Sequence, residues 1–186
     1  MVREVGQEIV PVAAPGAKVG RGYIEPSLTT LDGKYYVTLR AEDGRGYVAV
    51  SEDGLKWAPQ VPWSWDDGTP LEMATTQQHW IIHSDALYLA YTRKHSSNAG
   101  VFRWRTPLFI TLVDRTTMRL VRSTERIAVP MLPATGKAKP PYGSNFHTTN
   151  ISPDESVVTE SLMHSNFSTN VFACRISWSK PNRLMS

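Results

Sequence analysis

The sequence predicts an all-β protein built from about three consecutive antiparallel meanders. Short runs rich in β-branched and aromatic residues fall into three groups, each about 40–50 residues long and separated internally by turn residues. No segment shows the 3.6-residue apolar repeat of a convincing helix. Groups of this length and strand content are typical of β-propeller blades. We therefore expect blade-like units at residues 22–71, 76–129 and 144–178, within one partial domain spanning residues 1–186.

The first unit is organised around a hairpin with a clear turn. Asp32-Gly33 lies between the β-rich runs Ile24–Leu31 and Lys34–Arg40, and this dipeptide favours a two-residue type I′ turn. Counting outward from the turn places Glu25 directly opposite Arg40. The two side chains should therefore meet on one face of the hairpin.

Period-two alternation divides this hairpin into two faces. We expect one face to pack against the core, and it carries Ile24, Pro26, Leu28, Tyr35, Val37 and Leu39. We expect the other face to be polar, and it carries Glu25, Ser27, Thr29, Tyr36, Thr38 and Arg40.

A further strand, Gly46–Ser51, leads into a turn motif formed by Ser51, Asp53, Gly54 and Trp57. The pattern Ser-x-Asp-Gly-x-x-Trp resembles the Asp-box of sialidases and related β-propellers, although the commoner form has one more residue before Trp. In that turn the Ser and Asp side chains hold the backbone, Gly supplies a positive φ and Trp packs into the blade. The resemblance therefore implies a structural role for these four residues.

The order of Glu25-Pro26-Ser27, Arg40 and the Asp-box is similar to a segment of sialidases, in which Glu is followed by Arg and then by an Asp-box. The likeness covers residues 22–57 and, more loosely, the run to about residue 126. It implies a sialidase-like propeller in which Glu25 is catalytic, polarising a Tyr nucleophile. It also implies that Arg40 is one of three arginines that bind the carboxylate of sialic acid. The alternative is a cross-strand ion pair that contributes roughly 0.2–1 kcal/mol.

Residues 93–126 contain eight basic residues against two acidic ones, which favours an anionic partner. Arginine predominates, and its planar fork suits carboxylate recognition better than lysine does. The alternation in Phe102-Arg103-Trp104-Arg105 predicts a strand with both guanidinium groups on one face. Arg105 is therefore a second candidate for substrate binding, while a solvated strand face explains most of the other basic residues. The chain has no nucleic-acid-binding signature.

The segments after the first hairpin predict loops and further strands. Residues 58–71 read as a surface loop, in which Trp63 and Trp65 would either floor a sugar subsite or anchor a blade edge. A second hairpin over residues 77–93 should turn at Asp85-Ala86, which would place Trp80 opposite Tyr91. His79 and His83 share a face there, and ordinary imidazoles are favoured over a metal site because no third ligand is evident.

Six more strands complete the expected series. They are Glu8–Ala14, Pro107–Asp114 with Met118–Val129, and then Asn145–Ser152, Ser156–Met163 and Asn170–Trp178. Between them, Pro130–Gly143 reads as a connector or a loop over a site, because its four prolines break regular structure.

Composition limits the remaining possibilities. A chain of 186 residues with 41% hydrophobic content suits one globular domain, and no apolar run reaches the length of a membrane span. Residues 1–10 do not read as a signal peptide, so the compartment is left open, although the resemblance is compatible with a secreted or periplasmic protein. The single Cys174 excludes an intrachain disulfide and reads as a buried thiol. We predict no cofactor and no metal.

The expected number of units is too small for a complete propeller. A closed ring usually needs about 4–8 blades, and only 24 residues precede Glu25. The early blades that carry the first arginine and the Asp acid/base of sialidases therefore have no room, and Tyr142 does not match the nucleophile motif. We expect missing blades or self-association, and no turnover by this chain alone.

Three functional hypotheses follow. The first is a sialidase-like exo-glycosidase that acts on a carboxylated sugar. The second is a non-catalytic carbohydrate-binding or scaffolding propeller fragment. The third is a two-carboxylate propeller glycosidase, in which Glu25 acts with Glu160 or with Asp154.

Overall fold

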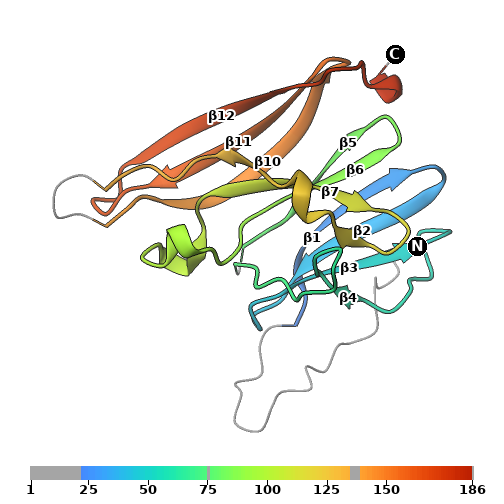
Figure 1. The fold of residues 1–186 in the computed structure, drawn as a ribbon, viewed down its shortest axis with the longest axis horizontal. Coiled ribbons are helices and arrows are strands. Elements are labelled where there is room, and N and C mark those ends of the chain that lie inside the picture. Colours follow the sequence, from blue (N-terminus) through green and yellow to red (C-terminus); the bar gives the residue numbers. More distant parts are fainter. Residues whose placement is uncertain (1–21, 75, 135–138, 186) are drawn as a thin grey trace, which may run out of the picture.

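The computed structural model describes residues 22–74, 76–134 and 139–185, and these residues form three antiparallel sheets in chain order (Figure 1). The predicted strand Glu8–Ala14 lies outside the described residues. Within the described residues there is no α-helix, and no helix is long and apolar enough to cross a membrane. The all-β prediction is therefore confirmed.

The first sheet has the strand order β1-β2-β3-β4. Its strands are β1 (Ile24–Leu31), β2 (Lys34–Arg40), β3 (Gly46–Ser51) and β4 (Val61–Pro62). Asp32 and Gly33 have φ values of 50° and 75°, as the two central positions of a type I′ turn require.

The register of β1 and β2 is as predicted near the turn and differs at the far end. Ser27 lies opposite Thr38, but Ile24 rather than Glu25 lies opposite Arg40. The reason is an irregularity of the β-bulge type between Ile24 and Ser27, where Glu25 has a φ of 54°. The prediction that Glu25 lies directly opposite Arg40 was therefore wrong.

The second sheet has the order β5-β6-β7-β8, and β9 also pairs with β7. Its strands are β5 (His79–His83), β6 (Ala86–Tyr91), β7 (Leu108–Asp114), β8 (Arg119–Leu120) and β9 (Arg126–Val129). Between β5 and β6 the turn residues are Ser84 and Asp85, so Trp80 lies opposite Leu89 and not Tyr91. Ser84 takes the positive φ of 55°, which leaves Ala86 in the strand and shifts the predicted register by two residues.

The third sheet is a meander of long strands in the order β10-β11-β12. The strands are β10 (Tyr142–Ser152), β11 (Glu155–Met163) and β12 (Thr169–Ser177). Short 3₁₀ turns account for the helical residues described: η1 (Ser96–Asn98), η2 (Phe102–Trp104), η3 (Arg122–Thr124) and η4 (Arg183–Met185).

The largest core cluster lies between the first two sheets and changes the interpretation of two predicted features. Trp63 and Trp65 are buried in it, at 0% and 6% exposure, so they cannot form the floor of an open sugar subsite. Tyr36 and Thr38, expected on a polar face, are buried on the same side, where Trp63 Nε1 donates to Thr38 Oγ1 at 3.1 Å. The prediction of one polar face was wrong because core side chains cover β2 on both sides.

The expected core face is only partly correct. Val37 and Leu39 pack in a small cluster with Ala49, and Tyr23, Tyr47 and Trp57 cover it. Leu28, expected on the same face, is 60% exposed.

The first strands of the three sheets lie side by side. Trp80 Nε1 of β5 donates to the Ser27 carbonyl of β1 at 3.0 Å, and Thr148 Oγ1 of β10 donates to the Trp80 carbonyl at 2.6 Å. A polar cavity of about 240 Å³ is lined by residues of all three strands. The strands β1, β5 and β10 are therefore the inner strands, where the three sheets meet.

Candidate functional site

Glu25 and Arg40 form a two-pronged ion pair at the inner edge of the first sheet. Arg40 Nε donates to Glu25 Oε2 at 2.6 Å, and Arg40 Nη2 donates to Glu25 Oε1 at 3.0 Å. Arg40 is 5% exposed, whereas the Glu25 side chain is 40% exposed. The bulge in β1 therefore changes the backbone register but still brings the two predicted side chains together.

Arg105 follows η2, and the segment that precedes it is not the predicted strand. Arg103 and Trp104 have φ values of 53° and 52°, so the chain turns sharply and the expected alternation of faces is lost. The structure nevertheless brings Arg105 close to the first hairpin. Burial, followed by the positive charges of Arg103 and Arg40, lowers the pKa of Arg105, while the charge of Glu25 opposes this effect. Two candidate arginines are thus close enough to repel each other.

A buried asparagine fixes the loop that carries Arg105. Asn98 Nδ2 donates to the carbonyls of Arg93 at 2.9 Å and Thr106 at 3.0 Å, and the His95 backbone N–H donates to Asn98 Oδ1 at 2.9 Å. The Gly143 backbone N–H then donates to Thr106 Oγ1 at 2.8 Å, which joins the loop to β10. Arg105 is therefore positioned by buried polar contacts on both sides.

Glu160 is a buried carboxyl group on β11 at the same place. It is 2% exposed, and burial raises its pKa to about 8, although a hydrogen bond from the Ser144 backbone and the charge of Arg105 act in the opposite direction. Its Oε1 makes no hydrogen bond to the described residues. A Cβ atom on Gly143 would contact the Arg105 carbonyl and would lie 2.7 Å from Glu160 Oε1, so only glycine leaves room there. At neutral pH this carboxyl group is mostly protonated.

Asp154, the other proposed partner of Glu25, lies elsewhere. It occupies the turn between β10 and β11, where its carbonyl accepts a hydrogen bond from Trp178. Six positions along an extended chain separate it from Glu160, which is about 20 Å. Of the two carboxylate pairs considered, the structure favours Glu25 with Glu160.

His79 joins this group from the start of β5 and was not predicted as a site residue. Burial, followed by the nearby His147, lowers the pKa of His79 to about 4, against the opposing charge of Glu25. Its imidazole is therefore neutral at neutral pH. His83, by contrast, packs against Trp178 at 4.4 Å between ring centroids. Within the described ranges no group of three or more His, Cys, Asp or Glu residues could hold a metal.

We call Glu25, Arg40, His79, Arg105 and Glu160 the inner site. It combines one ion-paired carboxylate, one carboxyl group that is protonated at neutral pH, two guanidinium groups and a neutral imidazole. Such a group can attract an anion and can donate a proton. Sequence reasoning identified Glu25, Arg40 and Arg105 as candidates and named Glu160 only in an alternative.

The turn that resembles an Asp-box lies at the other end of β2 and β3. Gly54, with a φ of 72°, donates its backbone N–H to Ser51 Oγ at 2.9 Å, and Asp53 Oδ1 accepts from the Leu55 and Lys56 backbones at 2.8 Å each. Trp57 packs on the small cluster beneath the sheet. Ser51 pairs with Tyr35, at the opposite end of β2 from Arg40. This turn therefore supports the sheet and lies apart from the inner site.

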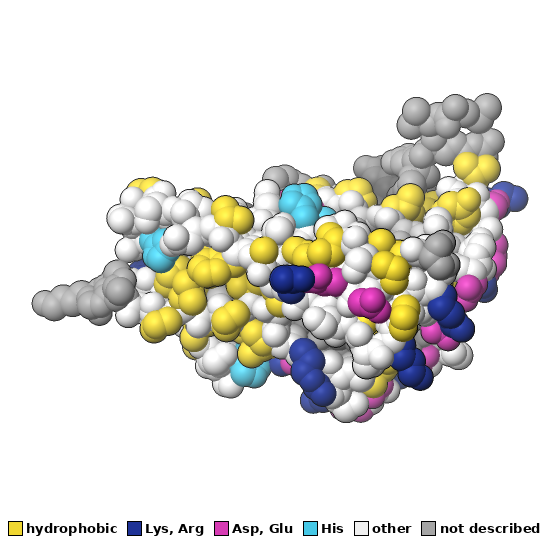
Figure 2. Space-filling view, turned by 90° about the horizontal axis from the view of Figure 1, so that it is seen from above, with side chains coloured by type: hydrophobic (Ala, Val, Ile, Leu, Met, Phe, Trp, Pro, Cys, Tyr) yellow, Lys and Arg dark blue, Asp and Glu magenta, His cyan; other side chains and the backbone are white. Residues whose placement is uncertain are grey.

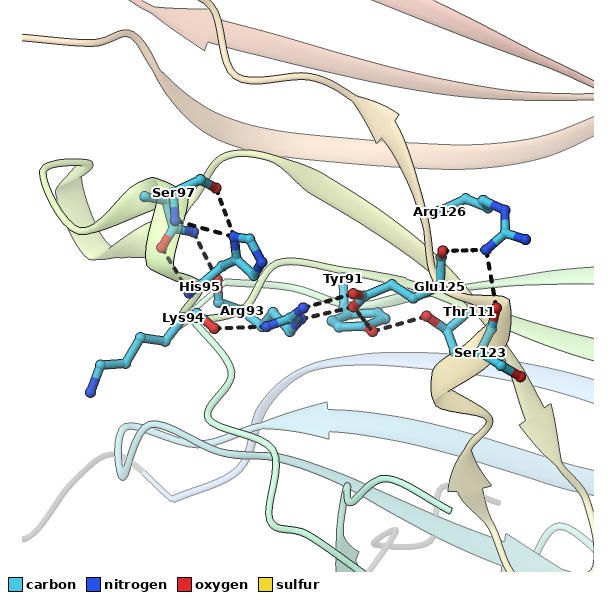
Figure 3. Close-up of polar contacts among 10 residues, drawn as sticks. Tyr91, Arg93, Lys94, His95, Ser97, Thr111, Ser123, Glu125 and Arg126 are labelled. Carbon is cyan, nitrogen blue, oxygen red and sulfur yellow. Dashed lines mark hydrogen bonds and ion pairs between the residues drawn. The ribbon is translucent and has the colours of Figure 1, made fainter. Parts of the chain in front are cut away.

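A second polar cluster, in the second sheet, is closed by its own contacts (Figure 3). Arg93 makes a two-pronged pair with Glu125, at 2.8 and 2.7 Å, and the Tyr91 hydroxyl donates to Glu125 Oε1 at 2.6 Å. Burial and the charge of Glu125 raise the pKa of Tyr91 well above its ordinary value. The guanidinium group also lies over the Phe109 ring at 4.8 Å. These contacts account for Arg93 as a structural residue.

Comparison with solved structures identifies the fold. The chain is similar to a bifunctional GH43-CE protein of Bacteroides eggerthii (14% identity, TM-score 0.56), to GH43B of a Bacteroides ovatus xyloglucan PUL (15%, 0.52) and to an endo-arabinase of Bacteroides thetaiotaomicron (8%, 0.54). The matches cover 87%, 87% and 82% of this chain but only 19%, 29% and 55% of those chains. No protein-family model and no curated protein sequence matches the chain.

These similarities show the β-propeller fold that is found in glycoside hydrolases of family 43, and this chain spans about a fifth to a half of the length of those three proteins. The predicted propeller, with blades built from antiparallel meanders, is therefore confirmed. The narrower likeness to sialidases is not supported by these neighbours, because none of the three is a sialidase.

Proposed function

We propose that the inner site belongs to a propeller glycoside hydrolase that acts on a sugar bearing a carboxylate, of the sialic-acid type that the sequence pattern implies. The observation that supports this most strongly is the meeting of Arg40 and Arg105 beside Glu160, whose burial keeps it uncharged at neutral pH. Arg40 pairs with the ionised Glu25, and both Arg40 and Arg103 contribute positive charge near Arg105. A substrate carboxylate would balance this excess of positive charge.

Arg105 is the residue best placed to hold the substrate carboxylate. It is half-buried, and burial and repulsion from Arg103 and Arg40 lower its pKa, so the negative charge of a bound anion would offset both effects. Arg40 contributes charge and holds Glu25, to which it donates through Nε and Nη2. Binding affinity should therefore depend on Arg105 directly and on Arg40 through the ion pair.

Glu160 and Glu25 have the opposite environments that acid and base roles require. Glu160 would donate its proton to the glycosidic oxygen as the bond from that oxygen to the anomeric carbon breaks. The ion-paired Glu25 carboxylate would stabilise the positive charge that develops at the anomeric carbon. A water molecule would then form the new bond to this carbon, and its proton would return to the Glu160 carboxylate. The Tyr142 hydroxyl, in contrast, donates to Met163 Sδ at 3.0 Å, so a two-carboxylate scheme fits these residues better than one with a Tyr nucleophile.

The second candidate is a non-catalytic glycan-binding or scaffolding propeller. It is favoured by the closed Glu25–Arg40 pair, since only 5% of the Arg40 side chain is exposed. On this reading the inner site would bind an acidic sugar without turnover. The effect of a Glu160 substitution on the rate of glycoside hydrolysis distinguishes the two candidate functions.

Hydrolysis of 4-methylumbelliferyl glycosides by the full-length protein tests the proposal. We expect cleavage of an acidic glycoside, a sialoside or a glucuronide, in preference to an arabinofuranoside or a xyloside. Glu160→Gln should lower the rate by about 10²–10⁴-fold, as for other general acids, whereas Asp154→Asn in the distant turn should not change it. Binding without turnover would favour the second candidate, and preferential cleavage of the neutral glycosides would contradict carboxylate recognition.

A further inference from the structure

A second hollow, separate in its lining residues from the inner site, lies beside η1 and η2. It is a cleft of about 520 Å³, lined by Glu72, Arg93, Lys94, His95, Ser96, Ala99 and Trp104. Figure 3 shows Lys94 extending away from the closed Arg93–Glu125 cluster, with His95 beside it. A cleft of this size falls in the range of small-molecule sites.

The cleft combines one aromatic wall with exposed polar groups. Lys94 Nζ lies over the Trp104 ring, 5.6 Å from its centroid, so a sugar ring that stacks on this face would take the place of the ammonium group. Lys94 also pairs with Glu72 at 3.2 Å, and both side chains are exposed. His95 Nδ1 lies 2.7 Å from Ser97 Oγ. The electron-rich ring face that attracts an ammonium group also suits the C–H groups of a sugar ring.

We propose that this cleft is a carbohydrate subsite for a neutral pyranose ring, which would stack on Trp104 and form hydrogen bonds to Glu72, Lys94 and His95. Carboxylate, ammonium and imidazole groups supply both acceptors and donors for sugar hydroxyls. Arg93 also lines the cleft, but its guanidinium group is engaged in hydrogen bonds to Glu125.

One loop links the cleft to the inner site. Trp104 lines the cleft, the next residue, Arg105, belongs to the inner site, and both Arg103 and Trp104 have positive φ values. Such strain in two consecutive non-glycine residues persists only where the surroundings fix the backbone. Asn98 fixes the backbone here, since its Nδ2 lies within 3.5 Å of the carbonyls of Trp104 and Thr106. If the proposed function holds, the two sites would bind neighbouring units of one glycan, but binding in the cleft does not require turnover.

Ligand-observed NMR and calorimetry with lactose, cellobiose and xylobiose test this proposal on the full chain. We expect at least one of these neutral disaccharides to bind, and Trp104→Ala to weaken that binding at least about tenfold, or 1.4 kcal/mol. Trp104→Phe should give an intermediate affinity because it keeps an aromatic face. Phe102→Ala is the matched control, because Phe102 is an exposed aromatic residue of the same turn that does not line the cleft.

Two results would overturn the subsite. One is that none of the three disaccharides binds to the folded wild-type protein. The other is equal affinity for wild type and Trp104→Ala, with both proteins shown to be folded by circular dichroism. A parallel titration of the same proteins with sialic acid serves to separate the sites. Failure of the inner-site proposal would therefore be seen with acidic sugars, and failure of this proposal with neutral ones.

Discussion

Two glutamates of the inner site have the same side chain and opposite surroundings. Glu25 is 40% exposed and bound to Arg40, whereas Glu160 is 2% exposed with one oxygen lacking a hydrogen bond to the described residues. Glu25 and Arg40 could be found from the sequence because a turn and a motif lie close to them. Glu160 lies 135 positions from Glu25, and alternation along β11 shows only that it faces the same way as Val158 and Leu162. Its burial beside Arg105 depends on contacts between distant parts of the chain, which no local sequence pattern predicts.

The environment of Glu160 should appear in the pH dependence of stability. Its pKa is raised from an ordinary value of 4.5 to about 8, so the unfolded chain releases this proton first and stability falls as pH rises between these values. The lowered pKa of His79 acts in the opposite direction, but only between about 4 and 6.5. Between pH 6.5 and 8 the free energy of unfolding should therefore decrease by up to about 2 kcal/mol.

Urea denaturation of wild type and Glu160→Gln across pH 6.5–8 measures this effect. The variant should lose the slope, because glutamine has no proton to release. Parallel curves for the two proteins would show that Glu160 is not the group responsible.

At the scale of elements, the positions of the turns were predicted better than the strand registers and side-chain directions that follow from them. The Asp32-Gly33 turn fixes the register from Leu31 back to Ser27, but strict period-two counting cannot foresee the irregularity at Glu25. Residues 102–105 alternate as a strand would, yet they form a 3₁₀ turn. The deciding contacts come from Asn98, whose side chain offers the backbone an alternative to strand pairing.

The loop that carries Arg105 should therefore depend on Asn98. Asn98→Ala would leave the carbonyls of Arg93 and Thr106 without their donor, and for the buried contact to Thr106 this costs about 1–3 kcal/mol. Chemical denaturation should show the loss of stability, and acidic-sugar affinity should fall with it. Asn166→Ala is the control, because Asn166 is exposed in the turn before β12. Equal losses in both variants would contradict a special role for Asn98.

At the scale of the whole molecule, the described sheets leave one side of the propeller uncovered. Strand β12 pairs with β11 and has no partner on its other edge among the described residues. Val171 and Phe167, at and just before this edge, are 75% and 83% exposed. Figure 2, which looks onto the side of the molecule that carries the third sheet in Figure 1, shows hydrophobic side chains gathered there. The number of units could be estimated from the sequence, whereas the contacts between units depend on distant residues.

We therefore expect this chain to self-associate when it is studied in isolation. An open strand edge and exposed apolar side chains favour contacts between copies. Light scattering should give a mass that increases with protein concentration, and Val171→Lys should reduce that increase, because a charge on an edge strand opposes pairing. A constant monomer mass at high concentration would rule out this expectation.

The central claim is that the inner site recognises a carboxylate, and calorimetry with sialic acid and its methyl ester tests it most directly. The two ligands differ at one group, which is an anion in the acid and an uncharged, larger methyl ester in the other ligand, so the arginine variants are needed to assign a difference in affinity to charge. We predict that the acid binds at least about tenfold more tightly than the ester. We also predict that Arg105→Lys or Arg40→Lys removes this preference, because lysine cannot form the planar two-pronged contact, whereas Arg175→Lys in an exposed pair keeps it. Equal affinity for acid and ester, or a preference unchanged in Arg105→Lys and Arg40→Lys, would contradict the claim.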